Sequence, residues 1–241
     1  MANYITVFLL FCILRTQSYA QITTRITCLF SGTSLSDAPR YTLRQMIPEP
    51  PNELYRTGDL PNGKAEFWID IDTEILFKLV VNNTLAWSLF VEPGQDISLV
   101  FEQMPNQVRL QKIINSANTT FAVRWDSLYT RQVRNLRISR NEVKQKKISQ
   151  ADYTTRVKSG FDKLINELTQ TNSPLVAYDG FFKIIDLEPD ENKTLSVTQY
   201  EFALARLEQK FPRSNRLSSA RKSLKNAFNK TNPIQPVIIH E

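Results

Sequence analysis

The most regular alternation of apolar and polar residues in the chain lies between residues 63 and 102, where it is interrupted by an apolar run at 74–81. Within KAEFWIDI at 64–71, Phe67 and Ile69 share one face, while Trp68 and Asp70 share the opposite face. A period of two residues predicts β-strands with one buried face. Turn residues separate the segments of this kind, and four strands are therefore expected, at 64–71, 74–81, 85–91 and 96–102.

Shorter alternating segments flank this central stretch on both sides. They predict further strands at 22–30, 40–47, 53–57 and 108–114. The prolines of 48–52 exclude that segment from a sheet interior, because proline has no backbone N–H to donate. Short strands with a turn every 8–12 residues are typical of an antiparallel sandwich or an open barrel. We predict an antiparallel β-sandwich of 7–8 strands over residues 21–115.

The spacing of apolar residues widens to three and four from Ala117 onward, which predicts helices. The first helix is expected to run to about Lys147. Four more are expected to begin after a serine cap, at Ser149, Ser173, Ser196 and Ser214. The clearest apolar stripe lies in the second helix, at Tyr153, Val157, Phe161, Leu164, Ile165 and Leu168. The predicted fold class is therefore α+β, with an all-helical half of about five helices over 116–231 and an extended tail at 232–241.

The amino-terminal residues have the composition of an export signal. The apolar run at 5–14 is too short to span a membrane as a helix, and Ser18-Tyr19-Ala20 resembles a small-x-small cleavage site. We predict a signal peptide at 1–20 and a periplasmic or secreted protein after cleavage near Ala20. Since no Lys or Arg precedes the run, an uncleaved anchor is the alternative.

Composition and cysteine content disfavour several kinds of chemical function for this chain. The chain has 41% hydrophobic and 22% charged residues, as globular proteins do, and six glycines are few for a fold built on glycine-rich nucleotide loops. Cleavage would leave Cys28 alone, so neither an intramolecular disulfide nor a C-x-x-C dithiol is expected. Cys28 lies in an alternating strand, which favours a buried packing residue over a reactive thiol.

Three short motifs carry a resemblance to a known family. They are G-x-A-x-F-x-I-x-I at 63–71, LFVEPGQDISL at 89–99, and Leu207-x-x-x-Phe211-Pro212-x-Ser214. Together they resemble the N-terminal region of exported thioredoxin-like, thiol–disulfide oxidoreductase-type proteins (TlpA-like) of Gram-negative bacteria. In that family the second motif usually has proline-glycine-aspartate, whereas Gln95 precedes Asp96 here. The resemblance covers most of residues 21–230 and implies a β-sandwich, a helical stretch and then a thioredoxin-like domain.

The family's enzymatic part would begin near residue 235, yet the sequence has no Trp-Cys-x-x-Cys. Reductase activity and catalytic residues therefore do not carry over, and we expect a stand-alone accessory module or a truncated gene product. The predicted function is an exported, non-catalytic binding or interaction module with a protein partner in the cell envelope. The alternative is an accessory part of a thiol–disulfide exchange system with a separate thioredoxin-like partner. No catalytic residue, cofactor or metal ligand is predicted.

For the other residues that resemble catalytic or metal-binding groups, a structural role is the simpler interpretation. His240 is the only histidine and lies next to the end of the chain, where an imidazole is poorly positioned for metal binding or catalysis. Asp70 and Asp72 fall on one face of a strand, which favours a solvated outer face over a carboxylate pair. The loop at 186–192 has alternating oxygens like a calcium loop, but it lacks the glycine and the closing glutamate. We expect a helix connection there, with a weak ion site as the remote alternative.

The segment 124–147 is strongly basic. It has eight basic residues against Asp126 and Glu142, a net charge of +6. Arginines three residues apart turn back by about 60° per step on a helix, so they spread over half the cylinder instead of forming a stripe. We interpret the segment as a solvated helix, with contact to an anionic membrane surface as the alternative. Export disfavours nucleic acid as a partner, and the sequence leaves the oligomeric state open.

Overall fold

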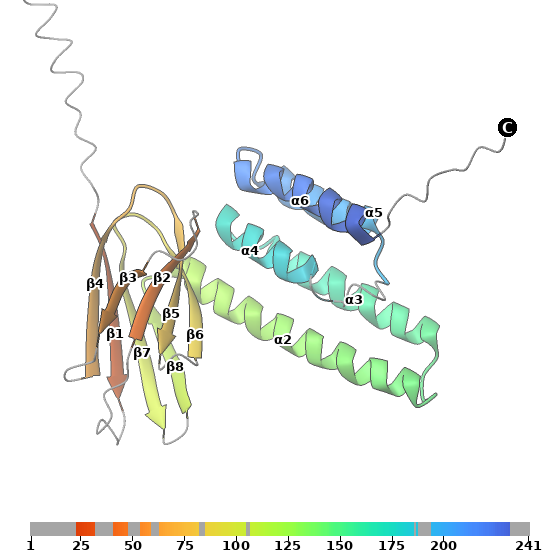
Figure 1. The fold of residues 1–241 in the computed structure, drawn as a ribbon, viewed down its shortest axis with the longest axis horizontal. Coiled ribbons are helices and arrows are strands. Elements are labelled where there is room, and N and C mark those ends of the chain that lie inside the picture. Colours follow the sequence, from red (N-terminus) through yellow and green to blue (C-terminus); the bar gives the residue numbers. More distant parts are fainter. Residues whose placement is uncertain are drawn as a thin grey trace, which may run out of the picture. The chain divides into compact units, whose positions relative to one another are not determined.

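The computed structural model describes residues 23–31, 41–47, 54–58, 63–81, 85–104, 107–185, 187 and 194–231. The predicted signal peptide at 1–20 and tail at 232–241 lie outside these residues. The chain divides into two compact units after Ser116, next to the domain boundary expected from the sequence. Unit 1 contains strands and unit 2 contains helices, which confirms the predicted α+β class (Figure 1).

Unit 1 consists of two four-stranded sheets. Sheet A has the strand order β4-β1-β7-β8 and sheet B has the order β3-β2-β5-β6. The strands are β1 (Thr23–Ser31), β2 (Tyr41–Ile47), β3 (Leu54–Gly58), β4 (Lys64–Asp70), β5 (Ile75–Val81), β6 (Leu85–Val91), β7 (Asp96–Met104) and β8 (Gln107–Ile114). One apolar core contains residues of both sheets, so the unit is a β-sandwich.

Aromatic side chains join the two layers of the sandwich. Tyr41 of sheet B contacts Phe67 of sheet A edge-on, with ring centroids 5.4 Å apart. Trp87 of sheet B lies against Phe101 of sheet A, with ring centroids 4.9 Å apart. Edge-to-face and tilted contacts of this kind are the favourable geometries for aromatic pairs.

The predicted register of β4 is confirmed. Phe67 and Ile69 are buried, whereas Trp68 is 60% exposed and Asp70 is exposed. The alternation arises because successive side chains of a strand point to opposite faces. The strands β5 and β6 supply the facing layer of the core, as expected from their apolar sequences.

The expectation of a purely antiparallel sandwich is wrong for one pair of strands. The pair β1–β7 is parallel, with Arg25 opposite Asp96 and Cys28 opposite Leu99. The other strand pairs in the described residues are antiparallel. Between β1 and β7 the chain passes through sheet B twice, so no hairpin fixes their relative direction.

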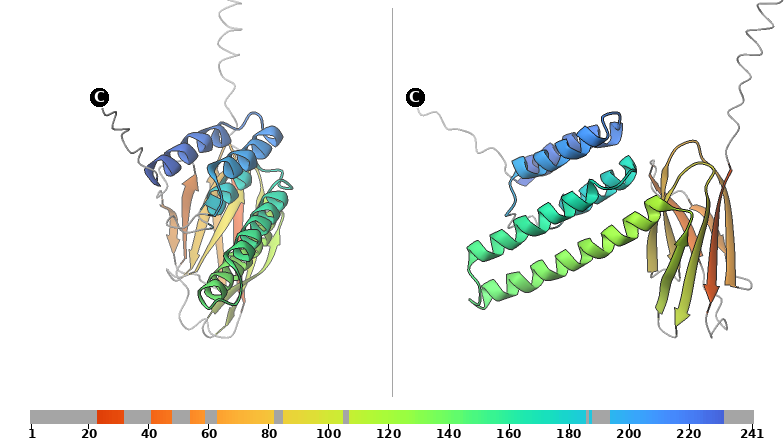
Figure 2. Two further views of the ribbon diagram at one scale, coloured as in Figure 1. Left: turned by 90° about the vertical axis from the view of Figure 1, so that its right-hand side faces the viewer. Right: turned by 180° about the vertical axis from the view of Figure 1, so that it is seen from behind.

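Unit 2 contains five helices within the described residues. They are α2 (Ala117–Lys144), α3 (Gln150–Leu168), α4 (Pro174–Ile185), α5 (Val197–Lys210) and α6 (Asn215–Thr231). The long helices α2 and α3 lie side by side, as do α5 and α6 (Figure 2). The apolar helix α4 packs against all four of the others. Every residue of the predicted stripe in α3 is buried in the core of this unit.

Serine caps begin the helices where the sequence predicts them. Ser149 Oγ accepts a hydrogen bond from the Asp152 backbone N–H at 3.1 Å, and the Asp152 carboxylate accepts one from the Ser149 N–H at 3.0 Å. This reciprocal pair is a capping box in which aspartate replaces the usual glutamate. Similarly, Ser173 Oγ accepts from the Val176 N–H at 2.9 Å.

The first helix ends three residues before the predicted Lys147. Lys146 has a φ of 57° and so adopts the left-handed conformation. Its N–H donates to the Val143 carbonyl, and the Lys147 N–H donates to the Glu142 carbonyl, both at 2.8 Å. These two bonds define a Schellman ending, which terminates α2 at Lys144 although no glycine marks the position.

Candidate binding site

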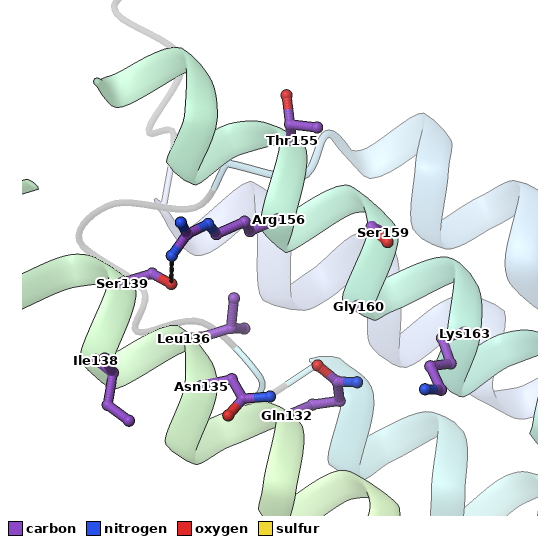
Figure 3. A pocket seen from close by; sticks show the side chains of 10 residues that line it. All are labelled: Gln132, Asn135, Leu136, Ile138, Ser139, Thr155, Arg156, Ser159, Gly160 and Lys163. Atoms are coloured by element: carbon purple, nitrogen blue, oxygen red, sulfur yellow. Dashed lines mark hydrogen bonds between the residues drawn. The ribbon is translucent and has the colours of Figure 1, made fainter. Parts of the chain in front are cut away.

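A surface groove lies between α2 and α3 of the helical unit (Figure 3). Its volume is about 520 Å³. Helix α2 contributes polar and aliphatic side chains to its walls, and α3 contributes basic and small ones. The lining residues are Gln132, Asn135, Leu136, Ile138, Ser139, Thr155, Arg156, Ser159, Gly160 and Lys163.

The width of the groove depends on a glycine. A Cβ atom placed on Gly160 would lie 3.2 Å from Gln132 Oε1 of the facing helix, closer than ordinary van der Waals contact. Gly160 therefore leaves room for the Gln132 side chain, while Leu136 supplies buried apolar surface between α2 and α3. Ile138 lies at the rim with 48% of its surface exposed, which is unusual for a large aliphatic residue.

Arg156 closes one end of the groove by joining the two helices. Its Nη1 donates to Ser139 Oγ at 2.9 Å and to Glu142 Oε2 at 2.7 Å (Figure 3 shows the first bond). Lys163 lies further along α3 and makes no ion pair or hydrogen bond with the residues that the structure describes. Since no acidic residue lines the groove, its two charged groups are both cationic.

The basic segment on α2 borders this groove. Its two acidic residues are both paired with cations from other helices: Asp126 with Lys183 of α4 at 2.8 Å, and Glu142 with Arg156 of α3. Arg124 pairs with Glu167. By contrast, four arginines of α2 make no ion pair with the described residues. These residues are Arg131, Arg134, Arg137 and Arg140.

The first three of these arginines are exposed, and Arg140 is half-buried. Their exposure agrees with the predicted solvated helix. The feature that the sequence did not predict is the separation of charges, in which the acids of the segment face other helices and the arginines face solvent. The solvent side of α2 next to the groove is therefore basic, and we call it the basic face of α2.

A second hollow of about 840 Å³ runs along α3 and shares Thr155, Ser159 and Lys163 with the groove. Asp162 and Glu167 also line it, together with Lys158. Its mixed charges are able to neutralise one another at short range. The second hollow is thus of mixed charge, whereas the lining of the first groove includes cations and no acid.

Cys28 is fully buried, in agreement with its predicted packing role. Burial raises the pKa of its thiol to about 12, because the charged thiolate is disfavoured away from water. The thiol is therefore protonated at neutral pH and shielded from reagents. Such a group is a poor nucleophile.

The carboxylates of β4 and the turn after it are exposed, as predicted for a solvated outer face. Asp70 Oδ1 accepts a hydrogen bond from Thr23 Oγ1 at 2.7 Å, and Asp72 lies in the turn. His240 and the proposed ion-binding oxygens at 186 and 188–192 lie outside the described residues. No group of three potential metal-binding side chains occurs among the residues that the structure describes.

The groove itself was not predicted from the sequence. Gly160 and Ser159 are small residues within an otherwise regular helical pattern, and Ser139 is a small residue on the facing helix. Small residues on two neighbouring helices leave room for a groove, but the pairing of α2 with α3 has to be known first. Spacing within one helix contains no such information.

Among the described helices, none combines the length and apolar composition that crossing a membrane requires. No family model, curated protein or solved structure matches this chain. The resemblance to the N-terminal region of TlpA-like proteins therefore stays a prediction.

Proposed function

We propose that this protein is an exported, non-catalytic binding or interaction module whose contact surface is the α2–α3 groove with its basic rim. The observation that carries the proposal is the acid-free character of this surface. Cations from two helices lie there, while Asp126 is paired with Lys183 of α4 and Glu142 with Arg156 at one end of the groove. Clustered charge of one sign attracts an oppositely charged partner and orients its approach.

The chemistry of the groove favours binding over turnover. A nucleophilic hydroxyl needs a neighbouring base to accept its proton. The neighbour of Ser139 Oγ is instead the Arg156 guanidinium, which donates to it and has no acceptor atom. Amide and hydroxyl groups with fixed cations are suited to hold an anion, and they give no route for bond cleavage.

The alternative function is an accessory role in thiol–disulfide exchange, with the redox chemistry on a separate thioredoxin-like partner. A strand unit followed by a helical unit is the layout that the family resemblance implies, and this order favours the alternative. In that case the chain would change the activity of its partner while having none of its own.

An insulin-reduction assay with dithiothreitol tests both proposals. The purified chain should not accelerate reduction above the background rate, because a lone buried thiol cannot cycle as a dithiol. The chain is then added to the same assay driven by a separate thioredoxin-like protein. Unchanged turnover supports the binding module, and altered turnover supports the accessory role. Turnover by the chain alone that is lost in Cys28→Ser would contradict both.

A further inference from the structure

We infer that the groove and the basic face of α2 bind an acidic peptide segment of a partner protein, with carboxylates on the arginines and an apolar side chain at Ile138. This inference rests on the proposed function and specifies the chemistry of the partner. The charge, the geometry and the apolar surface of the site support it.

The first argument is the imbalance of charge. Arg131, Arg134 and Arg137 are exposed and make no ion pair with the described residues. The acids nearest to them in sequence are occupied by Lys183 and Arg156. An anionic partner supplies the missing charges, and its carboxylates replace water around the guanidinium groups.

The second argument is geometry. Arginines three residues apart rise about 4.5 Å and turn back by about 60° per step, so Arg131, Arg134 and Arg137 spread over about 120° of the helix surface, more than a single small anion can contact. Guanidinium groups are planar and bind carboxylates through two parallel hydrogen bonds. A peptide with several carboxylates that crosses α2 obliquely contacts one arginine after another.

The third argument is the apolar surface within the basic face. Ile138 follows Arg134 by four residues and so lies on the same side of α2; it is 48% exposed and lies on the rim of the groove, with Leu136 between the helices. A ligand with charge alone would leave this surface in water. A peptide with an apolar residue among its acids covers it, which removes apolar area from solvent.

A membrane surface fits these observations less well. A helix that lies in a bilayer interface inserts a broad apolar face among the lipids. The apolar face of α2 is instead packed in the core of its own unit, through residues such as Trp125 and Leu136. Ile138 is the large aliphatic residue that α2 exposes.

The test measures the binding of a fluorescein-labelled, glutamate-rich peptide with one central leucine to the full chain, by fluorescence anisotropy. One variant combines Arg131→Glu, Arg134→Glu and Arg137→Glu. A matched control variant combines Lys112→Glu, Arg213→Glu and Lys222→Glu, which are exposed elsewhere and change the net charge equally. We expect the first variant to weaken binding at least about tenfold and the control to change it less than about twofold. Circular dichroism establishes that both variants are folded.

A second variant separates the apolar contact from the charges. Ile138→Gln should weaken binding of the leucine-containing peptide about threefold or more, and leave an all-glutamate peptide within about twofold. A peptide with glutamines in place of the glutamates should not bind.

Three results would overturn the inference: no binding of the acidic peptide, equal loss in the two triple variants, or tighter arginine-dependent binding to phosphatidylglycerol-containing vesicles than to the peptide. The last result would assign the face to a lipid surface. None of these outcomes contradicts the proposed function, which fails instead if the chain itself turns over substrate in the insulin assay.

Discussion

Arg25 of β1 and Asp96 of β7 form an ion pair across the parallel strand pair of sheet A, with Arg25 Nε donating to Asp96 Oδ1 at 2.9 Å. The Arg25 guanidinium also lies 5.4 Å from the centroid of the exposed Trp68 ring on β4. Three neighbouring strands thus present one connected group of side chains on the outer face. The hydrogen bond from Arg25 lowers the pKa of the Asp96 carboxyl below its usual value of 3.8.

The Arg25–Asp96 pair predicts a pH-dependent difference in Tm. Since the pKa of Asp96 is lower in the folded state, its contribution is present above the unfolded value near 3.8 and is lost as the pH falls through the folded value. At pH 7 the wild type should have a higher Tm than Asp96→Asn, and the two Tm values should converge at acid pH. The difference should be small, because exposed ion pairs are screened by solvent. A gap that widens in acid would contradict this assignment.

The register of β4 predicts opposite outcomes for neighbouring positions. Phe67 is 1% exposed and contacts Tyr41, so Phe67→Ala should destabilise unit 1 by about 3–5 kcal/mol through lost transfer energy and a cavity. Asp70 lies on the exposed face, and Asp70→Ala should change stability by about 0.5 kcal/mol or less. Urea denaturation measures both. A silent Phe67→Ala with a severe Asp70→Ala would mean that the register is inverted.

Burial of Cys28 predicts both low reactivity and alkaline sensitivity. A thiol reagent should modify Cys28 only after denaturation. Because the folded pKa of about 12 exceeds the usual value of 9.0, the stability that the neutral thiol contributes is lost as the pH rises through this range. Cys28→Ala should have a lower Tm at pH 7 and a shallower decline above pH 9. Rapid labelling of the native chain at Cys28 would contradict the buried assignment.

Lys183 links two carboxylates in the helical unit, with its Nζ 2.8 Å from Asp126 Oδ1 and 2.9 Å from Asp179 Oδ2. Burial raises the pKa of Asp126, and the nearby Lys183 cation opposes this shift. The ionised form of Asp126 is therefore less favourable in the folded protein than in the unfolded chain. Lys183→Met should destabilise the unit by about 1–2 kcal/mol, less than for a fully buried pair because solvent screens these groups.

Asp126→Asn is the matched comparison for Lys183→Met. Because the folded pKa of Asp126 is raised, its protonated form favours folding below the unfolded value of 3.8, and this contribution is lost as the pH rises through the folded value. Asp126→Asn should therefore gain stability relative to wild type as the pH rises from 3 to 7. Thermal denaturation across this range measures it, and a relative loss would contradict the assignment.

Local patterns were sufficient to predict the elements of this fold. The alternation around Phe67 predicts a strand because its period is two, and Ser149 with Asp152 predicts a helix start because capping needs only neighbouring residues. The parallel pairing of Arg25 with Asp96 was not predictable in this way. It depends on how the chain crosses between two sheets, and no residue near either position determines that path.

The candidate site, too, depends on contacts between helices that local sequence patterns do not predict. The basic composition of 124–147 was evident from the sequence, but the pairing of Glu142 with Arg156 and of Asp126 with Lys183 depends on which helices are neighbours. Only after these acids are assigned does the face around Arg134 become one of unbalanced charge. The approach of Gly160 to Gln132, which shapes the groove, is likewise a property of two helices together.

The most direct test of the binding surface places a reporter inside the groove. Asn135 is exposed and lines the groove, so Asn135→Cys in a Cys12→Ser background takes an environment-sensitive dye, while buried Cys28 stays unlabelled. The control is the same dye at Lys222→Cys on α6, outside the groove. Titration with the glutamate-rich peptide should shift the emission of the dye at residue 135 and leave that at residue 222 unchanged. A response at residue 222 alone, or at both positions equally, would contradict the assignment of the groove between α2 and α3 as the binding surface.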